Sequence, residues 1–240
     1  MSLYTICQNA AEGIPINVPT TIYGNSDETA TMLLSQANRA GKALARMDWP
    51  ELQIEYEFTT TIGTADYALP DDFDRMISMT AWNRSQYWRA RGGLTPRAWQ
   101  EIKSSILGNT IIGTRFRIRR VSGIGFRALS LDPTPTAAED LVFEYISNQW
   151  CASSDLVTYR KAWGADTDVG ILDEYLLELG LHWRVLNRLG MSYLEEREEY
   201  DREVAKAFAV AGVMEPLELS PSRNIRLLNF RNVPDTHFGS

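Results

Sequence analysis

The spacing of apolar residues changes twice along this chain, and that change limits the folds open to it. Between residues 27 and 47, apolar residues such as Leu33 and Ala37 recur at the spacing of one helix face. Between residues 52 and 59, apolar and polar residues alternate, which is typical of a strand with one face in water. After Asp155 the helical spacing returns. The sequence therefore predicts an α+β protein in which a strand-rich segment lies between helical ones.

The helical segments carry recognisable start and stop signals. The long first helix is predicted at Asp27–Met47, where Asp27 offers a capping oxygen, and a short helix is expected earlier, at Leu3–Ala11. We expect Asp166, Thr167 and Asp168 to cap the next long helix and Gly190 to end it.

A second long helix follows Gly190 almost at once. Ser192 and Glu195 have the spacing of a capping box, and the apolar periodicity continues to Gly212. Two long helices joined by so few residues are expected to form an antiparallel αα-hairpin, and the first long helix then completes a helical bundle.

The central segment contains several short strand patterns separated by turn residues. One helix, at Arg97–Leu107 behind Thr95 and Pro96, is expected to interrupt them. Such a series favours an antiparallel β-sandwich or small barrel inserted into the helical bundle. Besides the segment at 52–59, the predicted strands are Arg75–Trp82, Arg115–Val121, Phe126–Leu131 and Leu141–Trp150.

Four regions follow from these patterns. We predict an N-terminal arm and first bundle helix at 1–49, a β-rich domain at 50–154, a helical hairpin at 155–212 and an extended C-terminal arm at 213–240. The arm has no sustained period but keeps many apolar residues, so we expect it to lie on the protein's own body or on a neighbour.

The charge balance restricts the class of partner. With 24 basic and 31 acidic residues, the formal net charge is −7, which argues against a protein that binds nucleic acid over its whole surface. Arg115, Arg117 and Arg119 nevertheless share one strand face. This stripe is either a contact face for phosphate or an acidic partner, or a solvated face balanced by Glu55 and Glu57. The nearby aromatic residues Trp82, Tyr87, Trp88 and Trp99 are interpreted as core.

Enzyme and cofactor chemistry have little support in the sequence. The two histidines, His182 and His237, lie in a helix and near the C-terminus, without the spacing of metal ligands or of a nucleophile and its base. No phosphate-binding loop connects a strand to a helix, so no cofactor is expected. Cys7 and Cys151 are interpreted as small buried apolar residues. No run of apolar residues approaches the roughly 18 that a membrane span requires.

The order of several segments along the chain is more specific than any one of them. This series resembles the head-to-tail adaptor proteins of tailed bacteriophages, the group similar to tail tubular protein A of short-tailed phages. The segments that carry the resemblance are YALPDDFDRM (67–76), TPRAW (95–99), LDPTP (131–135), FEYISNQW (143–150), ADTDVGILDEYLLELGLHWR (165–184), GMSYLEEREEY (190–200) and NVPDTHFG (232–239).

The resemblance implies a non-enzymatic structural protein of the virion neck, assembled in the host cytoplasm. It implies a homo-oligomeric ring, commonly of twelve copies, which lies below the portal, joins head to tail and extends the DNA channel. The partners would be the portal protein and downstream tail or nozzle proteins, with DNA passing through without sequence-specific binding and no membrane involved. The residues expected to contact the portal or a neighbouring subunit are Ile225, Leu227, Leu228, Phe230, Val233, Pro234, Asp235 and Phe238.

Two other functions stay open at this point. A virion-associated hydrolase of the cell envelope would need a pair of carboxylates as acid and base. Asp166, Asp168 and Glu174 would then line a cleft rather than cap a helix. A DNA-contacting virion component would instead use the basic residues of Arg115–Arg120.

Overall fold

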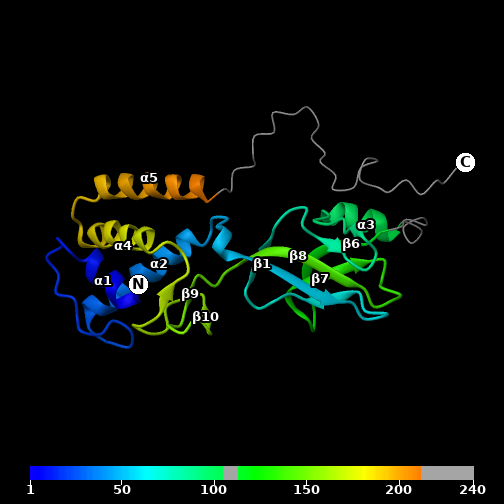
Figure 1. The fold of residues 1–240 in the computed structure, drawn as a ribbon, viewed down its shortest axis with the longest axis horizontal. Helices are drawn as coiled ribbons and strands as arrows, with labels where there is room; N and C mark the ends of the chain where they lie inside the picture. Colours follow the sequence, from blue (N-terminus) through cyan, green and yellow to red (C-terminus); the bar gives the residue numbers. More distant parts are fainter. Residues whose placement is uncertain (105–112, 212–240) are drawn as a thin grey trace, which may run out of the picture.

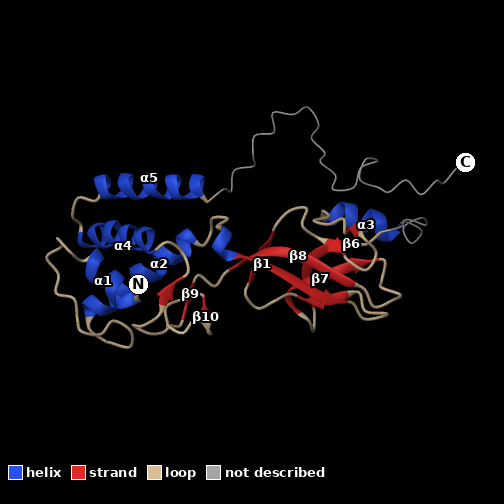
Figure 2. Cartoon of the chain, viewed as in Figure 1, coloured by secondary structure: helices blue, strands red, loops and turns tan. Residues whose placement is uncertain are grey.

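The computed structural model describes residues 1–104 and 113–211, with only the backbone described at residues 125 and 126. Helices gather in one half of the protein and most strands in the other (Figures 1 and 2). This arrangement confirms a mixed α+β protein with antiparallel sheets. In chain order the elements are α1 (Leu3–Ala10), α2 (Glu28–Leu44), η1 (Pro50–Leu52), β1 (Gln53–Thr59), β2 (Asp66–Ala68), β3 (Phe73–Met76), β4 (Trp82–Asn83), β5 (Trp88–Arg89), α3 (Pro96–Ser104), β6 (Arg115–Val121), β7 (Gly125–Asp132), β8 (Asp140–Ser147), β9 (Cys151–Ala152), β10 (Tyr159–Arg160), β11 (Val169–Gly170), α4 (Glu174–Leu189) and α5 (Leu194–Val210).

The helical half is built around α4, which packs against α1, α2 and α5. The Asp27 carboxylate caps α2 as expected, by accepting hydrogen bonds from the backbone N–H groups of Thr29 and Ala30. This helix ends at Leu44, three residues before the predicted end, and the Trp49 indole N–H donates to the Leu44 carbonyl at 2.9 Å. A side chain therefore satisfies a carbonyl that the helix leaves open.

The N-terminal segment belongs to the same core rather than forming an arm. Leu3, Ile6 and Cys7 on α1 are buried, and so are Ile14 and Ile22 beyond it. The spacing of Leu3, Ile6 and Cys7 places them on one helix face, and that face packs in the core cluster of the helical half. The short helix predicted at Leu3–Ala11 is therefore confirmed as α1 (Leu3–Ala10), and its apolar face is part of this core.

The strand-rich half contains two sheets. In one, β8 pairs with β1 along its whole length and also with β3 and β4, and β5 extends it beyond β4. In the other, β7 lies between β2 and β6. The two sheets contribute to a single core cluster, to which Phe143 and Tyr145 come from the first sheet and Phe116 and Leu131 from the second. Among the described strands, neither sheet closes into a barrel.

Two predicted strands are broken where the structure turns. The segment predicted as one strand at Arg75–Trp82 is divided between β3 and β4, because Met79 lies in a turn with a φ of 71°. The strand predicted at Leu141–Trp150 ends at Ser147, after which Trp150 packs in the core of the helical half. Apolar residues continue through both segments, so periodicity alone does not reveal these turns.

The start of α4 differs from its prediction. Asp173 caps this helix, with its carboxylate 2.8 Å from the Tyr175 backbone nitrogen, five residues beyond the predicted cap at Asp168. Between them, β11 pairs with β9, which also pairs with β10 in a small third sheet. The start of α5 also differs, because it follows Tyr193 with no side-chain cap, so Ser192 and Glu195 form no capping box. Gly190 ends α4 with a φ of 71°, as predicted.

Both cysteines are free and buried, which confirms their interpretation as small apolar residues. Burial and the nearby Asp166 carboxylate raise the pKa of the Cys7 thiol to about 12. Burial and the Asp168 carboxylate likewise raise the pKa of Cys151 to about 12. Both thiols are therefore protonated, and unreactive as nucleophiles, at neutral pH.

Candidate functional site

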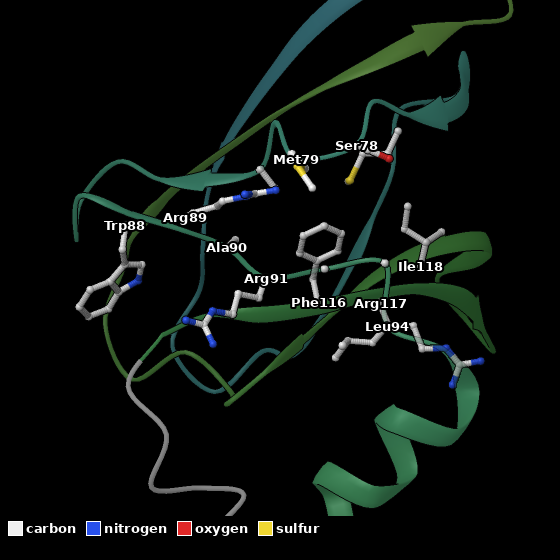
Figure 3. A pocket seen from close by; sticks show the side chains of 14 residues that line it. Ser78, Met79, Trp88, Arg89, Ala90, Arg91, Leu94, Phe116, Arg117 and Ile118 are labelled. Carbon is white, nitrogen blue, oxygen red and sulfur yellow. The ribbon is translucent and has the colours of Figure 1, made fainter. Parts of the chain in front are cut away.

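The strand-rich half contains a pocket of about 850 Å³ (Figure 3). It lies between the two sheets, where the turn after β3, the chain following β5 and strand β6 approach one another. We call it the arginine-rimmed pocket. Its lining residues are Met76, Ser78, Met79, Ala81, Trp88, Arg89, Ala90, Arg91, Gly92, Gly93, Leu94, Phe116, Arg117 and Ile118.

Backbone hydrogen bonds hold the segment after β5 in place across the two sheets. The Ala90 N–H donates to Ala81 next to the first sheet at 2.9 Å, and the Arg91 N–H donates to Thr114 before β6 at 2.8 Å. The Phe116 N–H in turn donates to the Arg91 carbonyl at 2.9 Å. A Cβ atom at Gly92 would overlap the Phe116 ring, so the close approach of this segment to the ring requires glycine.

Apolar side chains project beside the pocket into solvent. Met79 is 75% exposed and Tyr87 is 87% exposed, and both have a positive φ, which is uncommon for residues other than glycine. Trp82 is also exposed, at 46%. The interpretation of Trp82 and Tyr87 as core was therefore wrong, whereas Trp99, at 4%, is confirmed as core.

Three arginines on the pocket lining have no side-chain partner among the described residues. Arg89, Arg91 and Arg117 form no ion pair or side-chain hydrogen bond with the part of the chain that the structure describes. In Figure 3 the guanidinium groups of Arg91 and Arg117 point away from each other on either side of Phe116. Because they diverge, they frame an apolar floor rather than converge on one small anion.

The indole of Trp88, one of the lining residues, carries a buried hydrogen-bond donor. Its Nε1 atom has no acceptor among the described residues and is not accessible from the pocket. A buried donor without a partner is unfavourable by roughly 1–3 kcal/mol. The pocket itself offers an apolar floor and a positive rim, which together suit an apolar side chain accompanied by acidic groups.

The predicted stripe of Arg115, Arg117 and Arg119 does not form one solvated face. Arg115 is 6% exposed, and its guanidinium pairs with the buried Asp132 carboxylate at 2.5 Å. Lys103 pairs with the other oxygen of the same carboxylate. Arg119 donates to Ser130 Oγ at 2.6 Å and pairs with Asp66 at 3.3 Å. Of the three, Arg117 lies on the arginine-rimmed pocket.

The expected balancing charges have another partner. Glu55 and Glu57 pair with Arg84, at 2.9 and 2.8 Å, and these contacts raise the pKa of the Arg84 guanidinium, above all through the Glu55 hydrogen bond. They do not face the predicted stripe. Glu55 and Glu57 lie on β1 and the predicted stripe lies on β6, and these strands belong to different sheets. The sequence does not show which strands share a sheet, so it did not reveal that the glutamates pair with Arg84 instead.

The three carboxylates considered for hydrolysis are bound by the protein's own chain. Asp166 accepts from the backbone N–H groups of Ile22 and Tyr23, at 3.1 and 2.7 Å. Asp168 accepts from Arg160 and from backbone N–H groups, and Glu174 pairs with the N-terminal amino group. Asp166 and Glu174 bind distant segments of the chain and Asp168 binds its own loop, so all three carboxylates have structural partners.

No group of three or more histidine, cysteine, aspartate or glutamate side chains within 1–104 and 113–211 is placed to hold a metal ion. In those same ranges no helix is long and apolar enough to cross a membrane.

The predicted contact residues of the C-terminal arm lie outside the described residues. These are Ile225, Leu227, Leu228, Phe230, Val233, Pro234, Asp235 and Phe238.

Comparison with protein families identifies the chain's relatives. The family model described as SU10 adaptor protein matches residues 1–215, which include the helical half, both sheets and every residue that lines the arginine-rimmed pocket. No curated protein matches the chain.

Proposed function

Because the chain belongs to the SU10 adaptor protein family, a family of phage head-to-tail adaptors, we propose that it forms a ring below the portal and joins head to tail. In this ring, of about twelve copies, the protein extends the channel through which DNA leaves the capsid. Its role is structural and non-enzymatic, in the neck of the virion, after assembly in the host cytoplasm.

The length of the family match is the observation that carries this proposal. A match over residues 1–215 takes in both halves of the fold, so the resemblance does not rest on a single shared module. The order of segments along the sequence independently resembles the same class of protein. A family of adaptors implies contact with the portal on one side and with tail or nozzle proteins on the other.

We assign the portal or inter-subunit contact in part to the C-terminal arm. The family match ends at residue 215, so this assignment rests on the apolar residues between Ile225 and Phe238 and not on the family. Apolar segments without a core of their own gain stability by covering another surface. Many copies that engage together would also make individually weak contacts effective.

The charge of the chain suits a DNA conduit. A protein with a net charge of −7 has few general attractions for phosphate, so DNA can slide past it without being retained. The arginines at 75, 84, 115 and 119 pair with carboxylates of the protein itself, which reduces their availability to DNA further. We therefore propose that DNA passes without sequence-specific binding.

Removal of residues 214–240 is expected to leave the body folded and to reduce head–tail joining by at least about tenfold, since many weak contacts are lost together. Joining is measured as infectious particles recovered when purified heads, tails and adaptor are mixed. Far-ultraviolet circular dichroism checks that the body remains helical.

Two full-length variants test whether the apolar residues of the C-terminal arm, rather than its length, are needed for joining. Replacement of Ile225, Leu227, Leu228 and Phe230 by serine should reproduce the defect of the truncation. Replacement of Ser220, Ser222, Asn224 and Asn229 by alanine should not. Normal joining by the truncated protein would refute the role assigned to the arm.

A further inference from the structure

The start of helix α5 carries acidic residues and an exposed leucine, and so has the opposite charge to the arginine-rimmed pocket. At the start of α5, Leu194 is 62% exposed. Four glutamates follow it on the helix, Glu195, Glu196, Glu198 and Glu199, with Arg197 as the one basic residue among them. None of the four forms an ion pair or side-chain hydrogen bond with the described part of the chain. We call this surface the acidic end of α5.

The acidic end is more than a stabilised helix start. Glutamates in the first turn favour the positive end of the helix dipole, and Glu195 and Glu196 serve that purpose. Glu198 and Glu199 lie beyond the first turn, where the dipole no longer explains them. Meanwhile Tyr200 and Val204 hold the opposite side of α5 in the core, so the acidic end is presented on a fixed helix.

The two surfaces match in kind and lie far apart within one chain. The pocket has an apolar floor and three arginines, whereas the acidic end has an exposed leucine and four glutamates, and none of these seven charged side chains has a partner within residues 1–104 and 113–211. Figure 1 places the start of α5 at the outer end of the helical half and β6 in the strand-rich half at the other end. The two therefore cannot meet within one subunit.

We propose that the arginine-rimmed pocket receives the acidic end of α5 from a second copy of this chain. Leu194 lies on the floor formed by Phe116 and Ile118, and the glutamates face Arg89, Arg91 and Arg117. The inference rests on the proposed function, because a ring requires two different faces of each subunit to meet. It assigns those faces, which the family match does not.

The two kinds of contact contribute differently. Burial of Leu194 against the apolar floor supplies affinity, as a central apolar anchor does in many interfaces. The arginine and glutamate rim sets orientation and rejects incorrect partners, since a like-charged surface is repelled.

The test reverses the charge of each surface and then of both. One variant carries Arg91→Glu and Arg117→Glu, a second carries Glu195→Arg and Glu198→Arg, and a third carries all four substitutions. A control with Lys42→Glu and Lys161→Glu makes the same charge change as the first variant at exposed positions elsewhere. The readout is the protein concentration that gives half-maximal assembly with purified portal, followed by light scattering.

Each double reversal should raise that concentration at least tenfold, and the control should not. The variant with all four substitutions should recover most of the wild-type assembly, because every copy then presents two reversed surfaces that again attract. This rescue is specific to pairing between copies of one chain.

Three outcomes would overturn the inference while leaving the adaptor function intact. Wild-type assembly by both double variants would show that these faces do not meet. A defect limited to the pocket variant, without rescue, would point to the portal or a tail protein as the occupant. Loss of salt-dependent DNA binding with normal assembly would point to nucleic acid. Failure of the wild-type protein to assemble with portal would instead contradict the proposed function itself.

Discussion

Replacement of Asp168 by alanine is expected to reduce the free energy of unfolding by about 2–4 kcal/mol. This carboxylate is 1% exposed and is held at four points. The Arg160 guanidinium donates to both of its oxygens, at 2.7 and 2.8 Å, and the backbone N–H groups of Gly164 and Ala165 donate at 2.7 and 3.0 Å. Alanine leaves these donors without an acceptor.

The effect should be large because the buried Asp168 side chain holds the loop of residues 160–168 together. The backbone at the end of this loop pairs with Leu3, through the Asp168 carbonyl, and with Ser2 and β9, through Val169, so a loosened loop also disturbs these contacts. Urea unfolding followed by circular dichroism measures the loss. Asp155→Ala is the matched control, since the Asp155 carboxylate also accepts from a backbone N–H but is exposed. Equal losses in the two variants would show that the Asp168 contacts stabilise little.

Replacement of Gly41 by alanine is expected to destabilise the protein by about 1–3 kcal/mol, by overpacking. The sign is informative, because glycine to alanine inside a helix ordinarily stabilises by about 1 kcal/mol. Here an added Cβ would overlap the six-membered ring of Trp150. That ring is buried, contacts Trp163 edge-on at 5.1 Å between centroids, and is fixed by an indole hydrogen bond to the Lys161 carbonyl at 3.1 Å. It therefore has little room to move.

A double-mutant cycle separates this contact from other effects. Trp150→Leu creates space beside residue 41, so Gly41→Ala should cost markedly less in that background than in the wild type. Ser35→Ala, at an exposed position on the same helix, is expected to be neutral or slightly stabilising. A stabilising effect of Gly41→Ala in the wild-type protein would mean that α2 and Trp150 do not lie so close.

The helix ends and strand limits that were predicted correctly depend on residues close to one another in the sequence. The cap at Asp27 and the stop at Gly190 follow from local backbone geometry, and both are confirmed. The alternating pattern of β1 and the limits of β6 likewise reflect a local period. Asp168 shows the limit of such reasoning. The residue has the spacing of a helix cap, but its carboxylate binds Arg160 and a loop backbone instead.

The arginine-rimmed pocket was harder to predict, because segments that are distant in the sequence form it. Arg115, Arg117 and Arg119 alternate along β6 as expected, yet a buried aspartate on β7 removes Arg115 from the surface. Arg89 and Arg91 line the pocket because backbone hydrogen bonds hold the chain after β5 between the two sheets. Met79 and Tyr87 are exposed because they lie in turns with a positive φ, which the spacing of apolar residues did not reveal.

The mass of the purified protein, alone and mixed with purified portal, tests the central claim most directly. Light scattering should give the mass of one chain for the protein alone and a ring-sized addition to the portal for the mixture. That result would support an adaptor that assembles on the portal. A protein that stays at the mass of one chain, with the portal mass unchanged by its presence, would contradict the account.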